Sequence, residues 1–386
     1  MLISDLYQSS VWLNQVTEFR HQLHARPCLS GEEAETVALI SDFLMPTAPD
    51  RVVPLVSGTG IAFVYKGSRP GIRLLLRADT DALPIQEVNV FEYKSRVHAV
   101  SHKCGHDGHT AMLAGLVPFL KKGDFPGEVV LLFQPAEEVG LGASAVIADP
   151  AFQSITPDFV AGLHNLPGYP TGNILLREGA FTAASEGITI HLDGKTAHAA
   201  YPETGLSPAL ALAQLLTGFE GMKNPVPDTS EFHLVTVIYA RLGTPAFGTA
   251  PGDAIIAATL RTFSNQGIDS LKSRLLSLAN EVAGRHGLVA GVSFNDPFRA
   301  TLSDPAMVMA ASEAAKASGC KVVMMQEPFR WSEDFGQFTE RWPGVFAGLG
   351  AGMNHAALHT PDYDFPDELI PIGMTFWENL VSQILK

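Results

Sequence analysis

Several short apolar runs of this chain end in side chains that can bind a metal ion or carry a proton. The strands of an open α/β sheet deliver such side chains to a crevice at their carboxyl ends, so this pattern favours that fold. The runs are 73–78 before Asp79 and Asp81, 129–133 before Glu137 and Glu138, and 159–163 before His164.

Apolar periodicity predicts an α/β fold with a mostly parallel sheet and helices on both of its faces. The expected helices are 10–24, 32–44, 110–120 and 142–147, and the expected strands are 60–65, 73–78, 129–133 and 159–163. We expect Cys104 and His106 to lie on a loop before the third helix.

The order of elements changes at about residue 185. Strands and helices then follow as β-α-β-β-α-β, which predicts a split-βαβ (ferredoxin-like) α+β domain. Helix and strand alternation resumes after residue 295 and runs to the end of the chain. We therefore expect a discontinuous catalytic domain, 1–184 with 296–386, and an inserted lid domain, 185–295.

Charge and cysteine content restrict the partners and the compartment. The 386 residues include 40 acidic and 26 basic side chains, for a formal charge of −14, and no basic run would follow a phosphate backbone. The first 20 residues contain no uninterrupted apolar segment of signal-peptide or membrane length. Three widely spaced cysteines do not make a disulfide framework. We expect a soluble cytoplasmic protein that binds neither nucleic acid nor membranes.

Residues 102–109 (HKCGHDGH) are the densest group of potential metal ligands in the chain. Cys104 and His106 are two residues apart around a glycine, so both can reach one ion. Either Asp81 or Asp107 could hold a ring nitrogen of a ligating histidine. The alternative is a polar loop whose histidines only bond to the backbone.

Glu137 and Glu138 are adjacent carboxylates after an expected strand, so they point in different directions. One can bind a metal while the other moves the proton of a water molecule activated there. We assign Glu137 as the general base and Glu138 as the ligand. Taken alone, the pair fits an acidic helix start after Pro135 equally well.

Other motifs are weaker. Histidines such as His164 and His359 are more often structural than ligating when considered singly. Residues 140–145 match G-x-G-x-x-A, but a dinucleotide site needs its first glycine directly after the strand. The chain has no G-x-S-x-G segment for a serine hydrolase.

Together these residues resemble the M20 metallopeptidase family, in particular its amidohydrolase branch of aminoacylases, hippurate hydrolases and auxin-conjugate hydrolases. The resemblance runs nearly from end to end of the chain. Its motifs are residues 20–27, 77–84, 104–109, 133–138, 194–200, 333–335 and 359–361.

The resemblance implies a centre of two divalent metal ions and Glu137 as general acid/base. It further implies that the inserted domain is a lid and dimerisation module of a homodimer. His198 would stabilise the oxyanion, often from the partner subunit, and Arg261 matches a family position on the lid, although a solvated strand charge explains it as well. The implied ligands are Cys104, His106, Glu138, His164 and His359, with Cys104 bridging.

Two positions depart from the family pattern. Gly248 stands where an asparagine commonly helps to hold a substrate carboxylate, and Cys28 replaces a common glutamate after Pro27. The expected function remains metal-dependent hydrolysis of the amide bond of a small N-acyl amino acid or related conjugate. A dipeptidase or carboxypeptidase on short peptides is the runner-up, and a non-catalytic metal-dependent binding protein is the alternative from another class. Thiolate, imidazole and carboxylate ligands suit Zn²⁺ or Co²⁺, and the resemblance adds Mn²⁺ and Ni²⁺.

Overall fold

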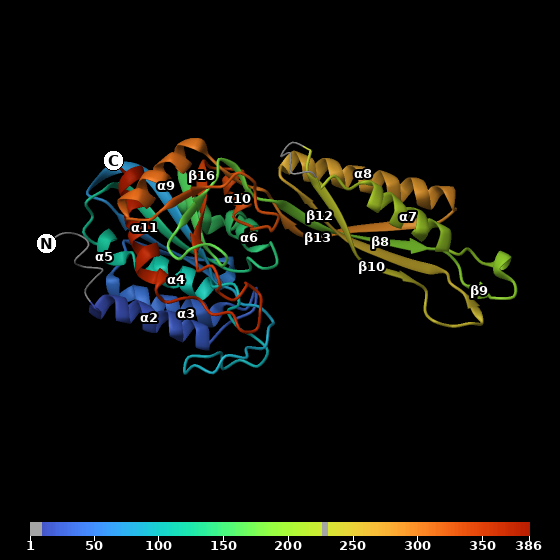
Figure 1. The fold of residues 1–386 in the computed structure, drawn as a ribbon, viewed down its shortest axis with the longest axis horizontal. Coiled ribbons are helices and arrows are strands. Elements are labelled where there is room, and N and C mark those ends of the chain that lie inside the picture. The colour runs from blue at the N-terminus through green and yellow to red at the C-terminus, as the bar shows by residue number, and fades with distance from the viewer. Residues whose placement is uncertain (1–9, 226–230) are drawn as a thin grey trace. The chain divides into compact units, whose positions relative to one another are not determined.

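The computed structural model describes residues 10–225 and 231–386 and divides the chain into two compact units (Figure 1). Unit 1 comprises Met1–Phe181, Thr301–Gln326 and Asp334–Lys386, and unit 2 comprises Thr182–Ala300 and Glu327–Glu333. The segment 327–333, which we expected in the catalytic domain, clusters with unit 2. None of the helices in the described part of the chain has the length and apolar character of a membrane span.

Unit 1 contains an eight-stranded sheet in the order β1-β2-β4-β3-β5-β16-β6-β15. The fold class expected from the sequence is confirmed, although the sheet is mixed: β1, β2 and β4 pair antiparallel, as do β16 and β6. The strands are β1 (Arg51–Leu55), β2 (Gly60–Lys66), β3 (Arg69–Asp79), β4 (Pro126–Gln134), β5 (Phe159–Leu166), β6 (Ile174–Leu176), β15 (Val322–Met324) and β16 (Gly344–Gly350). A further small sheet pairs β7 (Gly179–Thr182) with β14 (Thr301–Ser303).

The main hydrophobic core lies between one face of this sheet and the helices that pack on it, with Val117, Phe119 and Leu120 contributed by the residues that follow α4. Leu74, Leu76, Leu131 and Phe133 contribute from β3 and β4, and each is completely buried. Helices α6 (Gly142–Ala148) and α10 (Gly336–Thr339) contact β4 and β16. The core helices are α2 (Ser10–Ala25), α3 (Ala34–Leu44), α4 (His106–Ala114), α9 (Pro305–Ala317) and α11 (Leu369–Ile384), and a short helix α5 (Val117–Leu120) follows α4.

Four adjacent strands of the sheet position the site. β4, β3, β5 and β16 are neighbours in this order and run parallel. Their carboxyl ends therefore meet at a single edge, and this is where ligands bind in open α/β sheets.

Some local expectations differ from the structure. Helix α4 begins at His106 rather than at Thr110, because Gly105 takes a left-handed conformation (φ 95°) that ends the loop directly before it. His164 lies within β5 instead of after it. Strand β1 was not among the expected strands. It contains Pro54, which is tolerated because β1 is an edge strand.

Unit 2 has a four-stranded antiparallel sheet in the order β10-β12-β8-β13. Along the chain the order is β8 (Ala184–Asp193), α7 (Ala209–Gly221), β10 (His233–Leu242), β12 (Asp253–Thr262), α8 (Asn265–Arg285) and β13 (Val289–Phe298). This is the β-α-β-β-α-β order of the ferredoxin-like fold. Both helices contact the sheet, and a small ribbon pairs β9 (Ala197–His198) with β11 (Thr249–Ala250).

Candidate metal centre

The five expected ligands come together at the carboxyl edge of the sheet in unit 1. Glu138 follows β4, His164 lies near the end of β5, and His359 lies in the chain beyond β16. Cys104 reaches the same edge from the turn before α4, and His106 reaches it from the first residue of that helix. Segments that are 255 residues apart in the sequence thus meet at one place.

The donor atoms of these side chains are spaced as ligands of shared ions are. Sγ of Cys104 lies 3.4 Å from Nε2 of His164 and 3.4 Å from Nε2 of His359. Oε1 of Glu138 lies 3.6 Å from Nε2 of His359 and 3.8 Å from Nε2 of His106. Donors about 2.0–2.3 Å from one tetrahedral ion lie roughly 3.3–3.8 Å from each other.

Two of these donor atoms are buried without a hydrogen-bonding partner. They are Nε2 of His106 and Oε1 of Glu138. Leaving a buried polar atom unsatisfied costs about 1–3 kcal/mol, and more for a charged group. A divalent cation between them would satisfy both atoms, so the residues present fit a metal ion.

The electrostatics of the cluster also suit cations. Burial, together with the negative charges of Asp81 and Asp79, raises the pKa of Glu138 to about 7. Burial alone would lower the pKa of His106, but the carboxylates of Asp79, Asp81 and Glu138 outweigh it and raise that pKa to about 10. The surrounding carboxylates thus favour a positive charge at this place in the site.

The other two histidines are kept neutral. Burial lowers the pKa of His164 well below its ordinary value, and burial with the nearby His106 lowers that of His359. Nδ1 of His164 lies 2.7 Å from the main-chain oxygen of Asn165. This contact favours the tautomer with a free Nε2, which is the form that binds a metal.

Asp81 contacts two residues of the cluster. Its main-chain oxygen lies 2.9 Å from Nδ1 of His106. Oδ2 of its carboxylate accepts a hydrogen bond from the main-chain N–H of Glu138 at 3.0 Å and another from Ser30 Oγ at 2.6 Å. Asp81 therefore orients two of the expected ligands at once.

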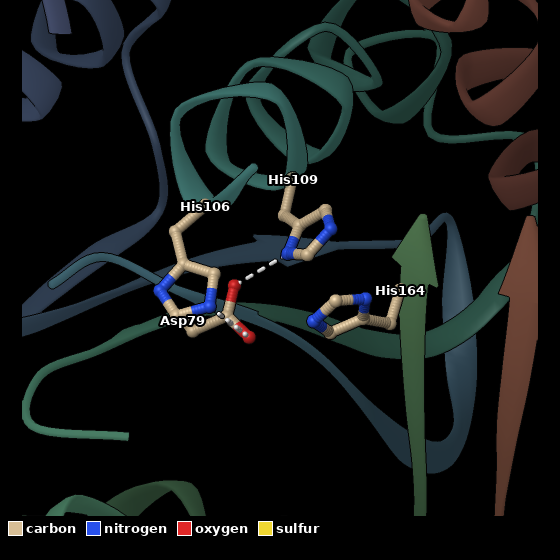
Figure 2. A group of neighbouring side chains, drawn as sticks. All are labelled: Asp79, His106, His109 and His164. Carbon is tan, nitrogen blue, oxygen red and sulfur yellow. Dashed lines mark hydrogen bonds and ion pairs between the residues drawn. The ribbon is translucent and has the colours of Figure 1, made fainter. Parts of the chain in front are cut away.

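Asp79 and His109 lie together beside His106 and His164 (Figure 2). From the sequence, His109 was expected to be a supporting or structural residue rather than a ligand, and Asp79 had no assigned role. Oδ1 of Asp79 lies 2.6 Å from Nδ1 of His109, and its Oδ2 lies 3.7 Å from Nε2 of His106. The other nitrogen of His109 lies 2.6 Å from Oδ1 of Asn165. Both nitrogens of His109 are thus engaged, and its ring packs edge-on to His164, with ring centroids 4.5 Å apart. The position of Asp79 at a strand end was the signal for this role.

Glu137, the expected base, lies beside the cluster. Its side chain is 7% exposed, and its Oε2 is 3.9 Å from Nε2 of His106. The preceding residue, Ala136, has a positive φ of 54°, as does His359 with 63°. Such conformations cost about 1–2 kcal/mol for a residue with a side chain, and they gather at functional sites.

The other expected site residues are Asp107 in unit 1 and His198 and Arg261 in unit 2. Asp107 turns away from the ligands and bonds to Arg20 and His24. In unit 2, His198 is exposed on β9, opposite Thr249 in the β9–β11 ribbon. Arg261 on β12 is half-buried and donates hydrogen bonds to the main-chain oxygen of Arg330 and to Ser332 Oγ. This ties β12 to the 327–333 segment.

A parallel-stranded edge that gathers thiolate, imidazole and carboxylate donors beside a separate carboxyl group defines a metal-dependent hydrolase. The sequence model of peptidase family M20/M25/M40 matches residues 75–383. The chain therefore belongs to this family, and it is a hydrolase that acts on amide bonds.

Individual relatives agree with this assignment. N-acetyl-L-cysteine deacetylase of Bacillus subtilis is 33% identical over 347 residues, covering 89% of this chain and 82% of the relative. Hippurate hydrolase of Campylobacter jejuni is 30% identical over 373 residues, 96% of each chain. Among solved structures, a Bacillus subtilis protein described as a dinuclear metal-binding peptidase of family M20 superposes with a TM-score of 0.84 at 27% identity, covering 98% of this chain and 99% of that one.

Proposed function

We propose that this protein hydrolyses the amide bond of small N-acyl amino acids or related conjugates. The observation that carries the proposal is the buried carboxyl group of Glu137 beside groups of side chains that could hold metal ions. The relatives named above act, by their names, on N-acetyl-L-cysteine and on hippurate, and both compounds are N-acyl amino acids.

The proposed cofactor is a pair of divalent cations, Zn²⁺, Mn²⁺, Co²⁺ or Ni²⁺. Cys104 lies between His164 and His359 and is the proposed bridging ligand. His106 and Glu138 complete the proposed ligand set. Bound there, the cations would lower the pKa of water toward about 7 and polarise the scissile carbonyl group.

Glu137 is the proposed general acid/base. Its carboxylate takes the proton of the attacking water and returns it to the nitrogen of the leaving amine. A carboxylate that transfers this proton must lie close to the reacting atoms and must not itself coordinate the metal ions. Glu137 fits because Glu138 provides the expected ligand atom next to it in the chain.

Unit 2 is the proposed lid and dimerisation domain, 185–295 in the bounds expected from the sequence. Its exposed His198 is the proposed donor to the oxyanion, and removing such a donor costs about 10²–10³-fold in kcat. Arg261 is a proposed substrate-binding residue. We further propose a homodimer in the cytoplasm with no nucleic-acid or membrane partner.

The test is turnover of a panel of N-acetyl, N-benzoyl and dipeptide substrates by protein reconstituted with each metal. Glu137→Gln should lower kcat by about 10²–10⁴-fold while the metal content stays unchanged. His198→Ala should lower kcat without changing metal content, and His191→Ala, an exposed histidine on β8, is the matched control.

Three outcomes would contradict the proposal. Undiminished activity of Glu137→Gln would refute the assigned base. Turnover confined to dipeptides would make the enzyme a dipeptidase. Metal binding without release of amine from any substrate would favour a binding protein.

A further inference from the structure

Glu33 is a buried carboxyl group that the mechanism above does not use. It precedes α3, and its exposed fraction is 0%. Its Oε1 accepts hydrogen bonds from the main-chain N–H groups of Gly31 and Ala136, both at 2.8 Å. The second bond joins positions 103 residues apart and fixes the connection between α2 and α3 to the turn after β4.

That turn carries Glu137. Its carbonyl groups accept main-chain hydrogen bonds from the N–H groups of Gly140 and Gly142, whereas the N–H groups on either side of Glu137 donate to side chains. The N–H of Ala136 donates to Glu33, and the N–H of Glu138 donates to Oδ2 of Asp81 at 3.0 Å. The residue between them is Glu137. Ala136 also has the positive φ noted above, a conformation that persists only where surrounding contacts hold it.

The same connection holds both anchors. Ser30 donates to the carboxylate of Asp81, and the N–H of Ala82 donates to the main-chain oxygen of Cys28 at 2.8 Å. Residues 28–33 therefore brace the segments that follow β3 and β4. Within this brace, Glu33 is the side chain that reaches the turn of Glu137.

We propose that Glu33 is a positioning residue for Glu137, which it orients through the hydrogen bond to the N–H of Ala136. This inference rests on the proposed function, because it assumes that Glu137 moves the proton. The reason for an effect on rate is geometric: a displacement of about 1 Å at a catalytic group can cost roughly 10²-fold.

The acceptor atom of Glu33, and not its charge, is what the turn requires. Burial raises the pKa of Glu33 to about 7, against the lowering effect of its main-chain hydrogen bonds, so near neutral pH the group is often uncharged. Its second oxygen, Oε2, is buried and has no hydrogen-bonding partner. A glutamine offers the same Oε1 acceptor without a charge.

Three substitutions of Glu33 distinguish the effect of the length of its side chain from the effect of its charge. Glu33→Gln keeps the reach of the acceptor, Glu33→Asp keeps the charge but shortens the side chain by about 1.5 Å, and Glu33→Leu keeps neither. Glu32→Leu is the matched control, because Glu32 is the exposed neighbour. The readouts are kcat, KM and metal content of the reconstituted protein, measured well below its unfolding temperature.

We expect Glu33→Gln and Glu32→Leu to keep the parental kcat. Glu33→Asp and Glu33→Leu should lose about 10–100-fold in kcat, with KM changed less than about threefold and metal content unchanged. Should Glu33→Leu fail to fold, the comparison of kcat between Glu33→Gln and Glu33→Asp tests the inference. Parental kcat in Glu33→Asp, or an equal loss in Glu33→Gln, would overturn the inference.

Glu137→Gln, assayed in parallel, separates this inference from the function on which it rests. A Glu137→Gln variant that retains its activity refutes the proposed base itself. If instead Glu137→Gln is inactive and Glu33→Asp is fully active, only the role of Glu33 is wrong.

Discussion

Nε of Arg20 donates a hydrogen bond to Oδ2 of Asp107 at 2.9 Å, and neither side chain is exposed to solvent. The pair links α2 to the residue that directly follows His106. Arg20 also pairs with Asp364 and, at 2.8 Å, with Asp367 in the chain before α11. The buried guanidinium of Arg20 thus connects helix α2, near the start of the chain, with residues 364–367, near its end. It also connects both with the 104–107 segment, which carries the proposed ligands Cys104 and His106.

We expect Arg20→Met to destabilise the protein by about 3 kcal/mol, because it removes the guanidinium from the buried carboxylate of Asp107 and leaves His24 as its ring partner. The measurement is urea unfolding followed by circular dichroism. Lys316→Met is the control: Lys316 forms an exposed pair with Glu313 at 2.7 Å, and such pairs contribute less than about 1 kcal/mol. Equal losses in the two variants would contradict a structural role of the buried pair.

Glu87 makes the stability of the protein depend on acid pH. Burial alone would raise the pKa of Glu87, but hydrogen bonds from His24 and Lys103 outweigh it and lower the pKa from 4.5 to about 2. A lowered pKa adds stability that is fully present above pH 4.5 and is lost as the pH falls through about 2. The expected contribution at pH 7 is about 1–3 kcal/mol.

Glu87→Gln measures this contribution as the difference in unfolding free energy from the parent between pH 2 and pH 7. The difference should be constant above about pH 4.5 and should shrink toward pH 2. Glu92→Gln, at an exposed neighbouring position, should show no such trend. A difference that grows as the pH falls would have the wrong sign.

Asp81→Ala should weaken metal binding by about 10–100-fold, because the N–H of Glu138 loses its acceptor and the support of His106 is loosened. Calorimetric titration of metal-free protein measures the affinity. Asp42→Ala removes an exposed carboxylate and should leave the affinity unchanged. Unchanged affinity in Asp81→Ala would show that the main-chain contacts of this segment are sufficient.

Removal of metal by a chelator should abolish turnover, and one of Zn²⁺, Mn²⁺, Co²⁺ or Ni²⁺ should restore it. We expect two ions per chain in the reconstituted parent and one or fewer in Cys104→Ala, since Cys104 is the proposed bridging ligand. Elemental mass spectrometry gives the count. Cys320→Ala, a half-buried cysteine elsewhere in unit 1, should retain both ions. Two ions in Cys104→Ala would refute the bridging role.

Local patterns in the sequence were sufficient for the fold class and the family. Apolar runs that end in polar residues predicted the sheet edge, and the β-α-β-β-α-β order of unit 2 follows from periodicity alone. The limits of elements were less predictable. The start of α4 at His106 depends on the conformation of Gly105. Strand β1 contains Pro54, a residue that is rare within strands.

Some of the supporting residues could not be predicted, because their partners are far away in the chain. Glu33 is one of two adjacent glutamates in a helix-start pattern, and nothing nearby distinguishes it from the exposed Glu32. Asp107 looked like a partner of a ligating histidine, yet it bonds to Arg20. In each case the partner comes from another segment of the folded chain.

The sequence by itself determined which donor types the protein has and the order in which strands present them, since side-chain chemistry and periodicity are local properties. Only the tertiary structure decided which donors face each other and which carboxylates hold them in place. The physical reason is that buried polar atoms must find partners wherever packing brings them together, and a linear pattern does not record distances across the fold.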